Sequence, residues 1–216
     1  VALGGDGGDE LLAGYPTFPA DRVAAFYPVP RALHERVVLP LADKLPVSTA
    51  NFSFDFKLKR FLRGARAPAG ERHPVWLGSF TPEEQRTLLT RAGGDPLETH
   101  RRHFESAPSG DRVERLVYLY AKTYLQDDIL VKVDRASMAC SLEVRAPFLD
   151  VELAEFLGRV PPRLKLHRLG TKYLLKRAMR DVLPEGIAGR AKKGFGVPVA
   201  EWIKGELREA VQDELS

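Results

Sequence analysis

The chain begins with VALGGDGGDELLAGY, Val1–Tyr15, in which four glycines and three acidic residues crowd into Gly4–Glu10. The apolar start predicts the end of a buried strand, and the glycines predict the turn that follows it. Glycines after a strand let the backbone approach a ligand, and their N–H groups bind phosphate oxygens. Carboxylates repel phosphate but share Mg²⁺ with it. Asp6, Asp9 and Glu10 are therefore candidate ligands of a metal ion or a substrate amine. An acidic turn that caps a helix explains the same residues.

The composition is typical of a soluble globular protein. The 216 residues are 44 % hydrophobic and 29 % charged, with a formal net charge of +4. This mild positive charge suits a phosphate-bearing partner, and an arginine-rich surface gives the same value. The lone Cys140 excludes an internal disulfide and a cysteine metal cluster, and we expect it to be buried. No stretch reaches the roughly 18 apolar residues of a membrane span. We therefore expect a cytoplasmic location and no membrane partner.

Helical spacing of apolar residues dominates the rest of the chain. The segments predicted to be helical are Asp21–Tyr27, Arg31–Lys44, Phe54–Arg63, a helix starting at Thr81, Asp111–Tyr124, Lys132–Ser141, Val151–Leu157, Thr171–Val182 and Ala200–Leu215. The sequence thus predicts a mostly helical chain with few short strands, forming a single domain over residues 1–216. The opening in mid-strand, with Val rather than Met, leads us to expect a preceding segment.

A second chemical stretch is YLQDDILVKVDRASMACSLEVRAPFLD, Tyr124–Asp150. Acidic and basic residues alternate along it, and Asp128 and Lys132 are one helical turn apart, so we expect them to pair. A salt-bridged helix followed by a turn explains this pattern. The small residues of Ala136–Ala139 also suit a helix that passes close to a ligand.

A third stretch is GRAKKGFGVPV, Gly189–Val199. Its cations, Arg190, Lys192 and Lys193, lie between glycines, so the segment could close over a polyphosphate and stabilise developing negative charge. An exposed basic loop explains the same residues. The five histidines show no spacing typical of a metal site.

Together the three stretches resemble the synthetase domain of glutamine-dependent asparagine synthetases. That family carries S-G-D-G-G-D-E followed by G-G-Y, similar to Gly4–Glu10 and Ala13–Tyr15 here. It carries D-x-x-S-M-A-x-x-x-E-x-R-x-P-F-L-D, matched throughout by Asp134–Asp150, and R-x-K-x-G-F, matched by Arg190–Phe195. Three motifs in the same order, from residue 1 to about residue 205, are far more specific than any one of them.

The resemblance implies the fold and the reaction. It implies the C-terminal part of an α/β adenine-nucleotide-binding, ATP-pyrophosphatase-like domain. Such synthetases use ATP and Mg²⁺ to adenylate the side-chain carboxylate of aspartate, and ammonia then displaces AMP. The ammonia comes from glutamine in a separate glutaminase domain of the parent chain. The resemblance leaves a homodimer of the parent open.

The resemblance also implies roles for individual residues. Asp6 aligns with an acidic residue that assists ammonia attack, and Lys192 aligns with a lysine that stabilises the transition state and the departing pyrophosphate. Asp9 is the candidate magnesium ligand on the chemistry of its carboxylate alone. The residues expected to bind substrate or nucleotide are Gly5, Gly7, Gly8, Asp9, Glu10, Asp128, Lys132 and Arg190.

The chain departs from the family pattern in three places. Gly4 replaces the usual serine, whose hydroxyl could touch the ligand. The pyrophosphate-binding S-G-G-x-D-S segment and the glutaminase domain are not present in the 216 residues. We therefore expect these residues alone to catalyse nothing.

Two other functions remain open. Similar domains in β-lactam synthetases and lasso-peptide cyclases adenylate other carboxylates for ring closure. A non-catalytic helical module could bind an acidic partner through its basic face. Nucleic acid is disfavoured as that partner, because aromatic residues are not interleaved with basic ones and no helix-turn-helix pattern stands out.

Overall fold

The computed structural model describes residues 1–46, 48, 53–89, 94–190 and 199–215. Contacts divide the chain into two compact units, Val1–Tyr27 with Gly64–Ala188 and Pro28–Arg63 with Gly189–Ser216. Helices dominate both units, and the described residues contain two strands of two residues each. The prediction of a mostly helical, strand-poor chain is confirmed. That residues 1–216 form a single domain stays a prediction.

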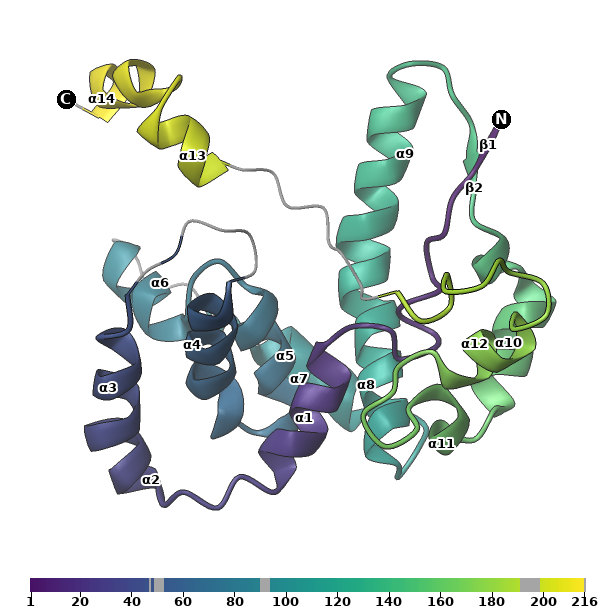
Figure 1. Ribbon diagram of the computed structural model, residues 1–216, viewed down its shortest axis with the longest axis horizontal. Coiled ribbons are helices and arrows are strands. Elements are labelled where there is room, and N and C mark those ends of the chain that lie inside the picture. Colours follow the sequence, from purple (N-terminus) through teal and green to yellow (C-terminus); the bar gives the residue numbers. More distant parts are fainter. Residues whose placement is uncertain (47, 49–52, 90–93, 191–198, 216) are drawn as a thin grey trace. The chain divides into compact units, whose positions relative to one another are not determined.

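The first unit is built around a helical rod (Figure 1). Its segments α8 (Arg112–Tyr120), the π-helical η2 (Ala121–Ile129) and α9 (Leu130–Met138) follow one another directly. Asp111 caps the start by accepting hydrogen bonds from two backbone N–H groups of the first turn. The sequence predicted a helix end at Tyr124 and a new start at Lys132. The π-helical turns instead carry the rod through this polar stretch without a break.

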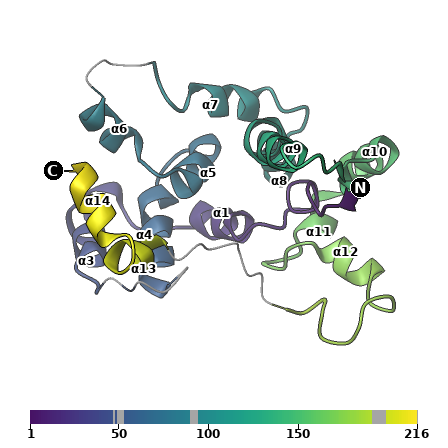
Figure 2. The ribbon, with the colours of Figure 1, turned by 90° about the horizontal axis from the view of Figure 1, so that it is seen from above.

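Shorter elements surround this rod. They are β1 (Ala2–Leu3), α1 (Thr17–Ala25), α5 (Ala69–Leu77), α6 (Pro82–Leu88), α7 (Glu98–Glu105), β2 (Val144–Arg145), the 3-10 turn η3 (Pro147–Leu149), α10 (Val151–Arg159), α11 (Pro162–Lys165) and α12 (Tyr173–Ala178). Viewed from above, α10 and β1 lie on one side of α9, and α7 lies on the other (Figure 2). The predicted start of α6 is confirmed, because Thr81 and Glu84 form a capping box.

Two apolar clusters hold the opening segment in place. Ala13 and Phe18 pack into one cluster with the inner face of α8, where Leu116 is 1 % exposed. Leu12, the neighbour of Ala13, packs into the other cluster with Leu157 and Val160. Because consecutive side chains enter different clusters, the segment after the glycine turn is fixed on two sides. It forms a series of turns, in which the N–H of Leu11 donates to the carbonyl of Gly7.

A buried ion triad joins three helices of the same unit. Asp21 on α1 is 2 % exposed, and its carboxylate contacts Arg72 on α5 at 3.2 Å and Arg112 on α8 at 2.5 Å. Two guanidinium partners satisfy a charge that would otherwise be costly to bury.

The second unit contains α2 (Arg31–Leu33), η1 (His34–Val38), α3 (Leu39–Asp43), α4 (Phe54–Ala65), α13 (Val199–Lys204) and α14 (Arg208–Leu215). The last two residues of α4 belong to the first unit. The first three elements run on as one helix, as predicted. The closing helix predicted over Ala200–Leu215 is interrupted at Gly205, which ends the turn of α13.

Two other findings concern the exposure of Cys140 and the length and apolar character of the helices. Cys140 is exposed, contrary to expectation, because it lies just beyond the C-terminal end of α9, where Ser141 turns the chain with a φ of 54°. None of the helices in the described ranges is both long and apolar enough to cross a membrane.

Candidate functional site

Two of the three chemical stretches meet in a small parallel sheet. Ala2 of β1 pairs with Val144 of β2, and Leu3 pairs with Arg145. The N–H of Gly4 then donates to the carbonyl of Arg145 at 2.7 Å, which extends the pairing into the glycine turn. Ligands of parallel sheets bind beyond the carboxyl ends of the strands. Both stretches therefore leave the sheet at the edge where a ligand is expected.

The glycines of the turn have different surroundings. Gly7 has a φ of 85°, and a Cβ on it would overlap the side chain of Leu149. A Cβ on Gly8 would come within 3.1 Å of the Phe148 ring. A Cβ on Gly5 would meet nothing within 4 Å. Gly7 and Gly8 thus allow the turn to pack on η3, whereas Gly5 has open space beside it.

Asp6 presents its carboxylate at this turn. The residue is half-buried, and a Cβ on Gly4 would lie 2.8 Å from its Oδ2 atom. Asp6 makes no hydrogen bond or ion pair within the part of the chain that the structure describes. The glycine that replaces the family's serine at position 4 leaves the room into which this carboxylate folds.

Asp9 is held by a cation from the far end of the first unit. Its Oδ1 atom lies 2.9 Å from the Nζ atom of Lys172. The backbone N–H of Lys172 donates to the carbonyl of Leu12 at 3.2 Å, which brings the lysine to this place. A Cβ on Gly14 would overlap both members of the pair. Gly14 therefore provides the space in which the ion pair forms.

Glu10 is buried, at 2 % exposure, beside a group of tyrosines. The hydroxyl of Tyr15 donates a hydrogen bond to Oε1 of Glu10. The Tyr15 ring stacks on Tyr120 with 5.2 Å between ring centroids and meets the edge of Tyr124. Burial, with the hydrogen bond and negative charge of Glu10, raises the pKa of Tyr15 far above its usual range. Tyr15 therefore remains a donor to the carboxylate.

Tyr124 connects these acids to Asp128 of η2. Burial raises the pKa of the Tyr124 hydroxyl. The negative charges of Asp128, Glu10 and Asp9 raise it further. Three predicted site residues, Asp9, Glu10 and Asp128, thus act electrostatically on one phenol.

Lys132 lies exposed on α9, one turn beyond Asp128. No ion pair joins the two side chains in the described residues, contrary to the prediction. The prediction assumed α-helical spacing. Because η2 is π-helical, with hydrogen bonds spanning five residues, side chains four positions apart no longer lie above one another.

The basic stretch belongs to the second unit. Arg190 is exposed there. Lys192 lies outside the described residues. Sequence reasoning misses Lys172 and Tyr124, since no local pattern marks either as a neighbour of the glycine turn.

No group of three His, Cys, Asp or Glu side chains in the described ranges is arranged to hold a metal ion. The magnesium role of Asp9 stays a prediction, as do the roles of the other candidate residues.

Comparison with known proteins identifies the family. The family model described as "Asparagine synthase" matches residues 1–216. The chain is 30 % identical over 216 residues to asparagine synthetase [glutamine-hydrolyzing] 1 of Bacillus subtilis, covering 99 % of this chain and 33 % of that protein. It is 34 % identical over 215 residues to a putative asparagine synthetase of Mycobacterium bovis, covering 97 % of this chain and 31 % of that protein.

A third relative, asparagine synthetase 3 of Bacillus subtilis, is 26 % identical over 212 residues, covering 94 % of this chain and 29 % of that protein. The chain thus spans about a third of the length of these relatives. No solved structure matches it. The match over the whole chain shows that it belongs to the asparagine synthase family, whose domain is the ATP-pyrophosphatase-like synthetase domain.

Proposed function

We propose that the protein carrying this chain makes asparagine from aspartate, ATP and ammonia derived from glutamine. The observation that carries the proposal is the pairing of β1 with β2. It joins the acidic glycine turn to the stretch Asp134–Asp150 at the carboxyl ends of both strands. A family match that spans the whole chain supports the same reaction.

The first chemical step is adenylation of the aspartate side chain. A carboxylate oxygen attacks the α-phosphorus of ATP, and the bond from that phosphorus to the pyrophosphate oxygen breaks. Negative charge grows on the leaving pyrophosphate, so cations that meet it in the transition state raise the rate. Lys192 and Arg190 supply these cations in the proposal. The open space beside Gly5 lets the substrate approach the backbone.

The second step forms the amide. Ammonia attacks the acyl carbon, the carbon–oxygen bond to AMP breaks, and the nitrogen loses one proton. Asp6 accepts that proton, or holds the attacking amine, in the proposal. Its carboxylate is suited to the task because it is half-buried, follows β1 directly and has no partner in the described part of the chain.

Magnesium binding is assigned to Asp9. Magnesium sites commonly use one or two carboxylates together with substrate phosphates, so a cage of three acidic side chains is not required. The ammonium group of Lys172 lies 2.9 Å from Oδ1, so in this assignment magnesium displaces it or binds the other carboxylate oxygen, Oδ2. Bound magnesium supplies positive charge that offsets the charge of the phosphates. Glu10 and Asp128 add negative charge near the same place, which favours a cation.

The 216 residues alone are proposed to be inactive. The pyrophosphate-binding segment S-G-G-x-D-S of the family does not occur in them. The test incubates the 216-residue chain with ATP, Mg²⁺, aspartate and ammonia, and measures pyrophosphate. We expect no turnover, and sustained release would contradict this part of the proposal.

The decisive experiment uses the full-length protein with ATP, Mg²⁺ and glutamine or ammonia, and a panel of carboxylates beside aspartate. Pyrophosphate and asparagine are measured separately. We expect Asp6→Asn to slow ammonia-dependent synthesis by about 100-fold or more, the size of a lost proton-transfer group. Asp181→Asn, at an exposed acid of the same unit, is the matched control.

Each outcome separates the candidates. Activity with another carboxylate and none with aspartate would favour the ring-closing relatives. A normal rate in Asp6→Asn would remove this residue from the mechanism. Absence of pyrophosphate release with every carboxylate would reject the synthetase reaction and favour a binding module.

A further inference from the structure

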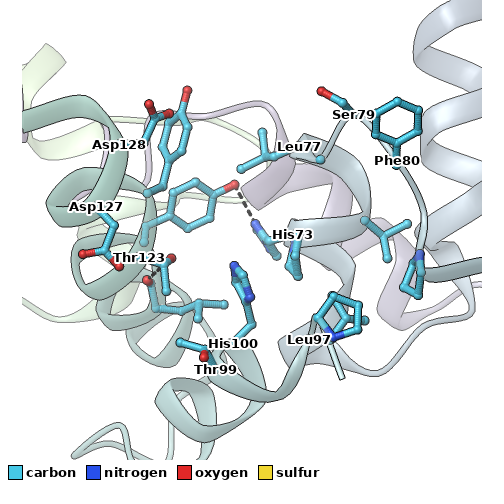
Figure 3. Close-up of a pocket in the computed structure, with 18 of the residues that line it drawn as sticks. His73, Leu77, Ser79, Phe80, Leu97, Thr99, His100, Thr123, Asp127 and Asp128 are labelled. Carbon is cyan, nitrogen blue, oxygen red and sulfur yellow. Dashed lines mark hydrogen bonds between the residues drawn. The ribbon is translucent and has the colours of Figure 1, made fainter. Parts of the chain in front are cut away.

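The first unit contains a cavity of about 520 Å³ between α5, the start of α6, α7 and the α8–η2 part of the rod (Figure 3). Apolar side chains such as Leu77, Phe80, Leu97 and Leu119 line much of its wall. It lies on residues that belong to none of the three motifs, apart from Tyr124, Asp127 and Asp128 at one end. A space of this size can hold a small organic molecule.

His73 places an unused ring nitrogen in this wall. The side chain is 2 % exposed, and its Nδ1 atom lies 2.7 Å from the hydroxyl of Tyr120. Its Nε2 atom is buried without a hydrogen-bond partner among the described residues. Figure 3 shows the ring beside the space, and its dashed line marks the hydrogen bond between His73 and the Tyr120 hydroxyl. A buried polar atom without a partner costs free energy, so a ligand that supplies one is stabilised.

The hydrogen bonds of Tyr120 determine whether Nε2 of His73 is a hydrogen-bond acceptor or donor. The Tyr120 hydroxyl also lies 2.5 Å from Oγ1 of Thr17. When Tyr120 donates to Thr17, it accepts from Nδ1–H of His73, and Nε2 carries a lone pair; when Thr17 donates to Tyr120, Tyr120 can donate to Nδ1, and Nε2 carries the proton instead. In the first arrangement the wall can therefore accept a hydrogen bond from a ligand.

His100 on α7 also has a buried ring nitrogen, Nδ1, without a hydrogen-bond partner among the described residues. Burial lowers the pKa of His73 to about 3 and lowers the pKa of His100. Both imidazoles are therefore neutral near pH 7, and neither repels a cation.

The end of the cavity carries negative charge. Asp127 and Asp128 line it from η2, are exposed, and form no ion pair in the described part of the chain. Among the described residues that line the cavity there is no lysine or arginine. Acceptors without positive charge, two free carboxylates and apolar walls together favour a cation with an apolar body and disfavour a phosphate or carboxylate ligand.

We propose that this cavity binds a small organic ammonium ion, with its N–H groups toward the His73 Nε2 atom and the two aspartates, and its apolar body against the leucine and phenylalanine side chains. No group of three His, Cys, Asp or Glu side chains in the described residues is arranged to hold a metal ion there. The cavity shares Asp128 with the residues expected to bind substrate, and its occupancy is measured without ATP, so it can be tested apart from the adenylation step.

The test uses benzylammonium as the probe and benzyl alcohol as its uncharged counterpart of similar shape. Binding to the full-length protein, labelled with ¹⁵N at histidine, is followed by calorimetry and by the Nε2 resonances. We expect benzylammonium to bind at least tenfold more tightly than benzyl alcohol and to shift the His73 Nε2 signal. Benzyl alcohol binding equally well would overturn the proposal, as would a His73 signal that does not move.

Variants of Asp127 and Asp128 test whether the negative charge of these side chains contributes to binding. Asp127→Asn and Asp128→Asn should each weaken benzylammonium binding by about fivefold, the effect of one nearby unit charge in water-like surroundings. Glu105→Gln removes an exposed acid at the end of α7, outside the cavity, and should change nothing. Equal affinities in all three variants would reject the site. Because these side chains are exposed, loss of binding can be separated from loss of fold by the unfolding temperature.

Discussion

The ammonium group of Lys172 lies 2.9 Å from Oδ1 of Asp9, joining the glycine turn at the start of the chain to the beginning of α12. Lys172 adopts a left-handed backbone with a φ of 52°, and its N–H is bound to the carbonyl of Leu12. The pair is about three-quarters buried, which makes it stronger than a typical surface ion pair. It is a structural tie at the residue that carboxylate chemistry predicts as a magnesium ligand.

The space for this pair comes from Gly14. In Gly14→Ala the new Cβ would overlap the two side chains and lie 2.9 Å from the backbone Cα of Asp9, which cannot move freely. We expect the free energy of unfolding to fall by roughly 1–3 kcal/mol, the usual cost of overpacking. Urea unfolding measures it.

The matched control is Gly158→Ala on α10. A Cβ there would meet nothing within 4 Å, and alanine favours a helix over glycine. The control should be neutral or more stable by up to about 1 kcal/mol. Equal destabilisation of both variants would mean that the Asp9–Lys172 pair does not depend on Gly14.

The glycines of the turn should separate stability from binding. Gly7→Ala places a side chain at a φ of 85° against Leu149, and we expect a loss of roughly 2 kcal/mol or more in unfolding free energy. Gly5→Ala meets open space and should leave stability within about 0.5 kcal/mol. If substrate approaches the backbone at Gly5, this variant should bind ATP more weakly in the full-length protein. Unchanged ATP affinity in Gly5→Ala would place the nucleotide elsewhere.

The buried His73 should make the protein sensitive to mild acid. Its pKa is about 3 in the folded chain against 6.5 for an ordinary histidine, because burial disfavours the charged ring. Between these values the unfolded chain binds a proton that the folded chain does not, so stability is full above pH 6.5 and falls as the pH drops toward 3. The loss between pH 7 and pH 5 is roughly 2 kcal/mol.

The measurement is the unfolding free energy at pH 5 and pH 7 for the unsubstituted protein and for its His73→Gln variant. The variant removes the titrating group, so its dependence on pH should be weaker by about the same 2 kcal/mol, whatever its absolute stability. His103→Gln, at a half-exposed histidine on α7, serves as control and should keep the dependence of the unsubstituted protein. An unchanged slope in His73→Gln would show that His73 is not the acid-sensitive group.

Local chemistry predicts much of this fold from the sequence. The helix starts at Thr81 and Asp111 and the short strand before the glycines follow from residue types within a few positions. The continuous rod could not be predicted in this way, because its π-helical segment depends on packing rather than on propensity. The same change of helical spacing removed the expected contact between Asp128 and Lys132.

The candidate site was predictable as a list of residues but not as an arrangement. The motif resemblance brings together Asp9, Glu10 and Asp128, and the structure puts all three within electrostatic reach of Tyr124. The partner of Asp9 could not be inferred, since Lys172 reaches it through a left-handed turn far along the chain. The glycine pattern predicted a turn whose backbone binds a ligand. Gly7 and Gly8 instead pack against η3.

The last prediction concerns Lys192, which lies outside the described residues and rests on the match of Arg190–Phe195 to R-x-K-x-G-F. We expect Lys192 to act on the transition state of adenylation rather than on ground-state ATP. Only interactions that strengthen in the transition state raise the chemical rate. Lys192→Ala in the full-length protein should therefore lower kcat by about 100- to 1,000-fold, the usual effect of removing one such electrostatic group. KM for ATP should change far less.

Lys193→Ala is the matched control for this prediction, since it removes an identical charge one position away at a variable place in the motif. Steady-state rates of pyrophosphate release over a range of ATP concentrations give kcat and KM for both variants. If Lys193→Ala is the slow enzyme and Lys192→Ala is near normal, the motif has been aligned in the wrong register. If both variants only raise KM, the two lysines bind ATP, and the transition-state role is wrong. A kcat effect confined to Lys192 would leave electrostatic stabilisation of the departing pyrophosphate as its function, because the total charge of the segment is the same in both variants.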